Sequence, residues 1–163
     1  MPSIWSQTVK LPTFPTLDKD LNTDILIIGG GLAGVLCCYQ LTRAGVDCAL
    51  VEARTICSGV TKDTTAKITS QHGLIYQKLL REFGPDAARL YYEANEEALG
   101  EYRTLSKKLN FDFVEEDNFI YAREDITPLK KEMAALDALN IPSYFAHALP
   151  LPFPVAGAVA FPR

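Results

Sequence analysis

The spacing of apolar and polar residues is clearest near the start of the chain. Residues 25–28 form a short β-branched apolar run, which predicts a strand buried on both faces. Apolar side chains then recur at helical spacing as far as Arg43, and residues 47–52 predict a second strand. A glycine-rich turn separates the first strand from the helix. The pattern therefore indicates one βαβ unit.

The remaining segments carry other signals. Residues 1–23 contain three prolines and predict an extended arm. Residues 54–73 are rich in Ser, Thr and Gly and lack a clear period, which is typical of a functional loop. Helical spacing covers residues 74–110, with an interruption at Gly84 and Pro85, and covers residues 127–140.

Two β elements are expected in the last third of the chain. Residues 111–123 predict a small β-hairpin with its turn at residues 115–118. Residues 158–161 are strand-like and have no partner after them, so we expect an open edge that invites self-association or a completing chain.

Composition excludes several classes of protein. The chain has 163 residues, of which 48% are hydrophobic and 22% are charged, so it can bury a core. The net charge of −4 argues against a nucleic-acid binder. No apolar run approaches the ~20 residues of a membrane helix, and the N-terminus does not resemble a secretory signal. We therefore expect a cytoplasmic protein with no membrane contact.

Cysteine and histidine usage gives little support to a metal site. The four cysteines and two histidines form no C-x-x-C and no C-x-H pair. Reduced cysteines that serve as small hydrophobic residues explain the pattern more simply.

The glycine turn carries the strongest chemical signal. Gly29 permits a tight turn, Gly31 leaves room for a pyrophosphate to approach the backbone, and Gly34 allows the helix to pack closely on the strand. The helix N-terminus then offers free N–H groups and partial positive charge to phosphates. Glu52 lies at the end of the second strand, where a carboxylate can accept hydrogen bonds from ribose hydroxyls and would repel a 2′-phosphate. These residues predict a dinucleotide site that disfavours NADP.

Two stretches resemble a known family. The stretch DILIIGGGLAGVLCCYQLTRAGVDCALVEA resembles the ADP-binding βαβ unit of FAD-dependent oxidoreductases. The stretch SGVTKDTTAKITSQHGLIYQKL is similar to the D-amino-acid-oxidase/glycine-oxidase-like superfamily, within it to the branch often fused to a C-terminal Rieske domain. The resemblance implies an α/β fold with a Rossmann-type FAD-binding core over residues 24–83. It also implies that residues 84–163 begin a substrate or cap domain, truncated relative to the full family fold.

The resemblance also implies cofactor-binding roles. Pyrophosphate contacts fall on four residues of the turn and helix: Gly29, Gly31, Ala33 and Gly34. Glu52 would hold the adenosine ribose, and Arg54 would lie beside the adenine. Ser58, Gly59 and Thr61 would line the pyrophosphate and ribityl chain, and Thr65, Ala66 and Lys67 would approach the flavin. The alternative for the loop hydroxyls is ordinary capping, and the alternative for Lys67 is a surface lysine.

No catalytic residue follows directly from the sequence. His72 could lie near the reactive edge of the flavin and move a proton, or it could be a hydrogen-bonded loop residue. By resemblance, the parent protein would transfer a hydride from an amine, an amino acid or a similar small substrate to FAD. Two alternatives stay open: an NAD-binding Rossmann dehydrogenase, and a non-catalytic fragment or subunit completed by another chain. We expect the 163-residue chain alone to be inactive and to bind FAD weakly or not at all.

Overall fold

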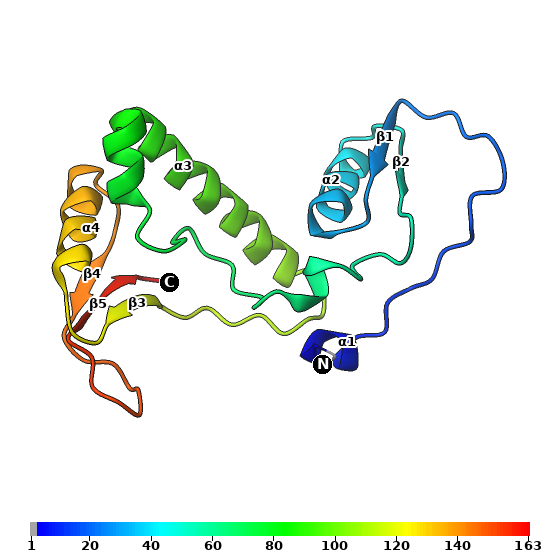
Figure 1. Cartoon of the computed structure of the whole chain (residues 1–163). Coiled ribbons are helices and arrows are strands. Elements are labelled where there is room, and N and C mark those ends of the chain that lie inside the picture. Colours follow the sequence, from blue (N-terminus) through cyan, green and yellow to red (C-terminus); the bar gives the residue numbers. More distant parts are fainter. Residues whose placement is uncertain (1–2) are drawn as a thin grey trace. The chain divides into compact units, whose positions relative to one another are not determined.

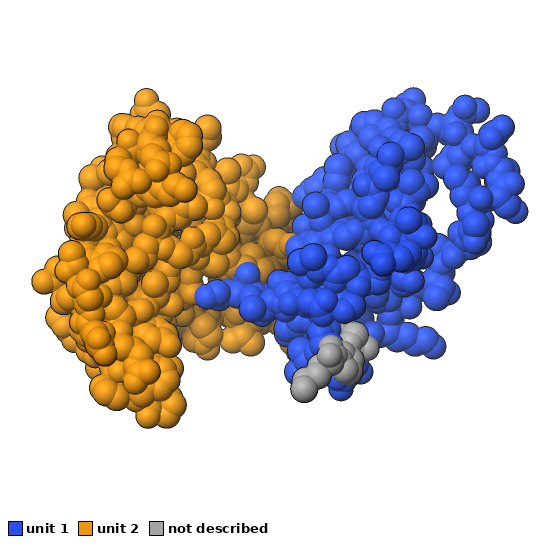
Figure 2. All heavy atoms as spheres, viewed as in Figure 1, with its two compact units in different colours: residues 1–67 blue, residues 68–163 orange. Residues whose placement is uncertain are grey.

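The computed structural model describes residues 3–163 and divides the chain into two compact units. Unit 1 comprises residues 1–67 and unit 2 comprises residues 68–163 (Figure 2). This division falls before the long helix of unit 2, whereas the boundary expected from the sequence, at residues 83 and 84, lies inside that helix. The expected division into functional domains stays a prediction.

Unit 1 contains the predicted strand–turn–helix–strand order (Figure 1). Strands β1 (Ile25–Ile28) and β2 (Cys48–Val51) pair in parallel, with Ile25 opposite Cys48 and Ile28 opposite Val51. Helix α2 (Leu32–Arg43) connects them and contacts both. A parallel pair needs such a crossover, so the glycine turn and helix are the connection that this sheet requires.

Helix α2 packs very closely on the end of β1. A Cβ atom placed at Gly34 would lie 1.9 Å from the carbonyl oxygen of Gly29, closer than any real side chain could approach. Glycine at this position is therefore a requirement of the packing.

The prediction that β1 is buried on both faces is wrong for the described chain. Leu26 is 53% exposed and Ile28 is 82% exposed, and both lie on one face because alternate residues of a strand point the same way. Helix α2 covers the opposite face, where Ile27 lies close to Gly34.

The predicted extended arm also differs from the structure. A short helix, α1 (Ile4–Thr8), precedes an irregular stretch that runs to β1. The polar loop after β2 contains one turn of 3₁₀-helix, η1 (Val60–Asp63), and α1 contacts η1.

Unit 2 combines two helices with a three-stranded sheet. Helix α3 (Tyr76–Ser106) bends at Gly84, whose φ of +81° lies outside the helical region, and Pro85 follows. The predicted interruption is thus present as a kink. Helix α4 (Thr127–Ala138) covers the sheet, which has the antiparallel order β3-β5-β4. Its strands are β3 (Asn118–Ala122), β4 (Tyr144–Ala146) and β5 (Gly157–Phe161).

Two expectations for this region are wrong. Residues 111–117 form no strand, so there is no hairpin over residues 111–123, and β3 pairs instead with β5. Strand β5 is the centre of the sheet and all of its residues are buried, so it presents no open edge. The small residues of β5 explain this position, because a Cβ at Gly157 would strike the ring of Phe145 on the neighbouring strand.

A buried carboxylate joins the two helices of unit 2. Glu132 on α4 is fully buried and accepts hydrogen bonds from the backbone N–H groups of Tyr76 (2.8 Å) and Gln77 (2.9 Å), at the first turn of α3. These N–H groups have no partner inside the helix, so Glu132 caps α3 from outside. Burial raises the pKa of Glu132, and the N–H donors oppose that rise.

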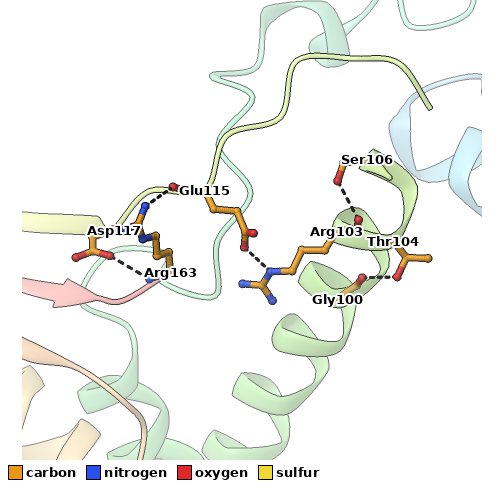
Figure 3. A network of polar contacts seen from close by, with 7 residues as sticks. All are labelled: Gly100, Arg103, Thr104, Ser106, Glu115, Asp117 and Arg163. Carbon is orange, nitrogen blue, oxygen red and sulfur yellow. Dashed lines mark hydrogen bonds and ion pairs between the residues drawn. The ribbon is translucent and has the colours of Figure 1, made fainter. Parts of the chain in front are cut away.

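Polar contacts replace the expected hairpin turn (Figure 3). Arg103 on α3 forms an ion pair with Glu115. Asp117 accepts a hydrogen bond from the backbone N–H of Arg163, just after β5, and another from the hydroxyl of Tyr144 on β4. The acidic segment before β3 is therefore tied to α3 and to two strands.

Candidate functional site

The glycine turn begins at the carboxyl end of the parallel sheet. Gly29 has a φ of +109°, a conformation that side-chain-bearing residues rarely adopt, and its N–H donates to the carbonyl of Val51 at 2.8 Å. Gly31 takes an extended conformation as the N-cap of α2. The backbone therefore turns from strand to helix at the edge of the sheet where open α/β folds bind ligands.

Glu52 holds this turn through its side chain. Its Oε2 accepts a hydrogen bond from the N–H of Gly30 at 2.9 Å, and its Oε1 accepts one from the N–H of Arg54 at 3.0 Å. These two backbone hydrogen bonds, the one from Gly30 first, hold the pKa of Glu52 below its usual value. The carboxylate is therefore charged at neutral pH and fixed beside the glycine turn.

The N-terminus of α2 has donors available. The N–H of Leu32 donates to the hydroxyl of Thr61 at 3.0 Å. The next two N–H groups, those of Ala33 and Gly34, have no acceptor among the described residues. The aligned peptide dipoles add partial positive charge at this end of the helix. The chemistry of these donors suits an anion.

The polar loop after β2 folds back onto the glycine turn. The N–H of Cys57 donates to the carbonyl of Gly30 at 2.7 Å, and Thr61 reaches Leu32 as described. The N–H of Ser58 donates to the carbonyl of Thr55 at 3.3 Å in a short turn, and Gly59 immediately precedes η1. The structure thus brings together the glycine turn, Glu52 and Thr61.

The last three predicted loop contacts lie at the end of unit 1. Thr65, Ala66 and Lys67 follow η1 in an exposed, irregular stretch, and Ala66 has a φ of +56°. Their roles at a flavin stay predictions, as does the position of Arg54 beside an adenine.

His72 lies in unit 2. Its Nδ1 forms a 2.7 Å hydrogen bond with the hydroxyl of Tyr91, and the two rings meet edge to face. His72 is therefore a hydrogen-bonded loop residue, which is one of the two interpretations given in the sequence analysis. Its role in moving a proton stays a prediction.

Three residues of this region received no role from the sequence. Gly30 is buried, and a Cβ there would lie 2.8 Å from the side chain of Ile56, so a larger residue at this position would force its surroundings to move. Cys57 binds the turn through its backbone. Trp5 donates its indole N–H to the carbonyl of Thr64. The triple glycine was the available signal for Gly30, whereas the sequence has no local signal for the other two contacts.

Two other kinds of feature are absent from residues 3–163. No group of three or more His, Cys, Asp and Glu residues is arranged to hold a metal ion there. No helix in that part of the chain is both long and apolar enough to span a membrane.

Comparison with known proteins gives a consistent result. The family described as FAD dependent oxidoreductase (DAO) matches residues 24–163. The chain is 36% identical over 152 residues to "Putative Rieske 2Fe-2S iron-sulfur protein YhfW" of Bacillus subtilis, a match that covers 91% of this chain. It is 26% identical over 81 residues, half of this chain, to gamma-glutamylputrescine oxidoreductase of Escherichia coli. It is 33% identical over 99 residues, 57% of this chain, to one subunit of the anaerobic glycerol-3-phosphate dehydrogenase of Haemophilus influenzae.

These relatives are much longer than the chain. The matched region spans 30% of the Bacillus protein, 19% of the Escherichia protein and 15% of the Haemophilus protein. No solved structure matches the chain significantly.

Proposed function

We propose that this chain, which belongs to the family of FAD-dependent oxidoreductases, binds the ADP half of FAD at the N-terminus of α2. In this proposal the βαβ unit is the start of a Rossmann-type core. The pyrophosphate lies against Gly29, Gly31, Ala33 and Gly34, and Glu52 accepts hydrogen bonds from the adenosine ribose. The observation that carries the proposal is the joining of the glycine turn to Glu52 by the Gly30 hydrogen bond.

The residues present fit this ligand. A Cβ at Gly31 would lie 3.4 Å from Thr61 Oγ1, so a methyl group there would fill part of the space between the helix N-terminus and Thr61. The N–H groups of Ala33 and Gly34 supply unused donors for phosphate oxygens. The two backbone hydrogen bonds use part of the acceptor capacity of Glu52, since a carboxylate has about four lone-pair sites. Acceptor sites therefore stay available for ribose hydroxyls.

The same proposal assigns the polar loop to the rest of the cofactor. Ser58, Gly59 and Thr61 would line the pyrophosphate and ribityl chain, and residues 65–67 would approach the flavin, with Arg54 beside the adenine. Hydroxyls and backbone amides are the groups that phosphate and ribityl oxygens need. Support comes from the two hydrogen bonds that tie this loop to the turn.

The reaction is proposed for the whole protein, of which this chain is the cofactor-binding part. FAD, when bound, would supply an acceptor for the hydride of a substrate C–H bond, such as the one next to an amine nitrogen. Two of the relatives are named for different molecules, gamma-glutamylputrescine and glycerol-3-phosphate, so their names do not agree on a substrate. An amine or amino acid follows from the sequence resemblance. Oxidation of a panel of amines, amino acids and polyol phosphates by the complete gene product tests that class.

The relative from Bacillus also suggests an electron acceptor. Its name includes a Rieske cluster, and these 163 residues contain no C-x-H or C-x-x-H pair to ligate one. We therefore propose that electrons pass to a cluster carried outside this segment. Sequencing the gene downstream of codon 163 tests this proposal directly, and a complete gene without such pairs contradicts it.

Gly31→Ala is the sharpest test of the phosphate site. The structure leaves room for the added methyl group, because it would be in ordinary contact with Thr61, and the φ of −79° suits alanine. The methyl group would nevertheless occupy space proposed for the pyrophosphate. We expect affinity for both ADP and FAD, measured by calorimetric titration, to fall about ten-fold or more. Urea unfolding should stay near that of the wild type, and unchanged affinity would contradict the assignment.

Glu52→Gln tests the ribose contact. The variant keeps one acceptor oxygen but loses the charge. Loss of one charge-assisted hydrogen bond lowers affinity about ten- to hundred-fold. Asp47→Asn is the matched control, because it removes the same charge at the opposite end of β2. ADP affinity should fall for Glu52→Gln alone. Titration with NAD in parallel separates the rival dinucleotide, and preference for NAD over FAD would overturn the cofactor assignment.

A further inference from the structure

We propose that Trp5 is a positioning residue that latches the far end of the cofactor loop, residues 57–67, through the carbonyl of Thr64. The indole Nε1–H donates to that oxygen at 2.8 Å, which joins α1 to a segment 59 residues away in the sequence. The role at the cofactor rests on the function proposed above. The latch itself is a contact within unit 1.

The hydrogen bond from Trp5 reaches the loop beyond the residues that bind the glycine turn and α2. Cys57 and Thr61 tie the near half of the loop to the glycine turn and to α2. Thr64 follows the last residue of η1 with an extended conformation, and the chain beyond it is irregular and exposed. A hydrogen bond to the Thr64 carbonyl fixes the peptide plane that leads into Thr65. Trp5 therefore restrains the stretch that carries the proposed flavin contacts.

The local backbone needs such a restraint. Ala66 has a φ of +56°, in a region where residues with side chains are uncommon and which costs free energy to occupy. The N–H of Ala66 reaches the Thr64 hydroxyl at 3.4 Å, so the conformation of Thr64 bears on that of Ala66. Release of the Thr64 carbonyl should loosen both residues together.

The positioning role of Trp5 can be distinguished from a role in packing α1, because the two roles predict different effects on ADP and FAD binding. The ADP half of the cofactor is proposed to bind the glycine turn and Glu52, whereas the indole N–H of Trp5 donates to Thr64, next to residues 65–67, which the flavin half needs. Loss of the indole N–H should therefore weaken FAD binding and leave ADP binding unchanged. A general loss of stability would weaken both.

The test compares Trp5→Phe with Thr8→Ala in the 163-residue chain. Trp5→Phe keeps an aromatic ring and removes the donor. Thr8→Ala removes a hydrogen bond inside the same helix, from the Thr8 hydroxyl to the Ile4 carbonyl, and keeps the latch. We expect Trp5→Phe to lower FAD affinity about two- to ten-fold, the effect of one hydrogen bond, with ADP affinity unchanged. Thr8→Ala should change neither affinity.

Limited trypsin digestion tests the hydrogen bond between Trp5 and Thr64 in the absence of any cofactor. Cleavage after Lys67 should be about two- to ten-fold faster in Trp5→Phe than in the wild type, because the loop opens more often, and unaltered in Thr8→Ala. Equal cleavage of Trp5→Phe and the wild type overturns the latch. Equal loss of ADP and FAD affinity in Trp5→Phe overturns the positioning role.

Fluorescence gives a further measurement on the wild type. Trp5 is the single tryptophan of the chain, so tryptophan emission comes from the place where α1 meets this loop. FAD should quench the emission by energy transfer to the flavin, and ADP should not. Equal emission with either ligand overturns the placement of the flavin near the latch. A wild type that binds neither ligand refutes the proposed function and the flavin role of Trp5, and the digestion still decides whether the latch exists.

Discussion

The close packing of α2 on β1 should make Gly34→Ala strongly destabilising. A methyl group at this position would lie 1.9 Å from the carbonyl oxygen of Gly29, whereas real Cβ atoms stay at least 3.0 Å from their neighbours. The neighbouring atom is backbone, so no side chain can rotate away. Helix and turn must therefore separate by about 1.1 Å, which displaces the N–H groups of Ala33 and Gly34 as well.

The expected magnitude follows from two opposing effects. Replacement of glycine by alanine inside a helix contributes about 1 kcal/mol of stability through helix propensity. Overpacking of a close contact costs about 1–3 kcal/mol and sometimes more. Since the contact at Gly34 is with rigid backbone, we expect the upper end of that range, and a net loss of about 2 kcal/mol from unit 1. With a urea dependence of about 1–2 kcal/mol per molar, the unfolding midpoint should fall by about 1–2 M.

Urea unfolding followed by tryptophan fluorescence measures this effect, because Trp5 lies in unit 1. Gly100→Ala is the matched control: Gly100 lies within α3, and a Cβ there would have no neighbour within 4 Å. It should stabilise unit 2 by about 0.5–1 kcal/mol, read from far-ultraviolet circular dichroism. If Gly34→Ala is as stable as the wild type, the close approach of α2 to β1 is refuted.

Three further predictions concern unit 2. Glu132→Ala leaves the N–H groups of Tyr76 and Gln77 without acceptors, so it should cost about 2–5 kcal/mol of unfolding free energy, and Glu132→Gln should cost less because one oxygen remains. Because burial raises the pKa of Glu132, its contribution to the free energy of unfolding should be fully present below the ordinary carboxyl pKa and should decline as pH rises through the raised value. The difference in unfolding free energy between the wild type and Glu132→Gln, measured from about pH 4 to about pH 8, tests this expectation. A difference that grows with pH contradicts it. The hydroxyl of Tyr144 and then the N–H of Arg163 lower the pKa of Asp117, so Tyr144→Phe should raise that pKa towards its usual value in a carboxyl NMR titration, and an unchanged value would rule out the hydrogen bond.

The βαβ unit could be predicted because each of its signals is local. The apolar run of β1, the glycine turn, the helical spacing of α2 and the second apolar run lie next to one another in the sequence. The kink of α3 was similarly predictable, since Gly84 and Pro85 interrupt a helical pattern at a defined point.

The sheet of unit 2 could not be predicted in the same way. Asn118 pairs with Phe161 and Ala122 with Gly157, so the segments that pair are separated by α4 and β4. Residues 111–123 show the pattern of a hairpin, and no local signal distinguishes a nearby partner strand from a distant one. Strand β5 is buried along its whole length and contacts α4, so its place at the centre of the sheet depends on the packing of distant segments.

The candidate site shows the same division between local and distant signals. The roles of glycine and of an acid after the second strand follow from known turn geometry, and the structure brings Glu52 to the turn. The contacts of Trp5 with Thr64 and of Thr61 with Leu32 depend on how a polar loop without periodicity folds back. Such contacts require the three-dimensional path of the loop.

Glu52 connects the fold of unit 1 with its proposed ligand. In the structure it already accepts from Gly30 and Arg54, so its carboxylate is oriented before any cofactor arrives. A ribose that donates to the remaining lone pairs would add hydrogen bonds without breaking these two. Binding then needs little rearrangement of the turn, and little of the interaction free energy is lost to ordering it. It follows that removal of the Glu52 side chain should disturb the glycine turn and the ribose contact together. Glu52→Ala should therefore weaken ADP binding more than Glu52→Gln, in which one oxygen can still accept from Gly30.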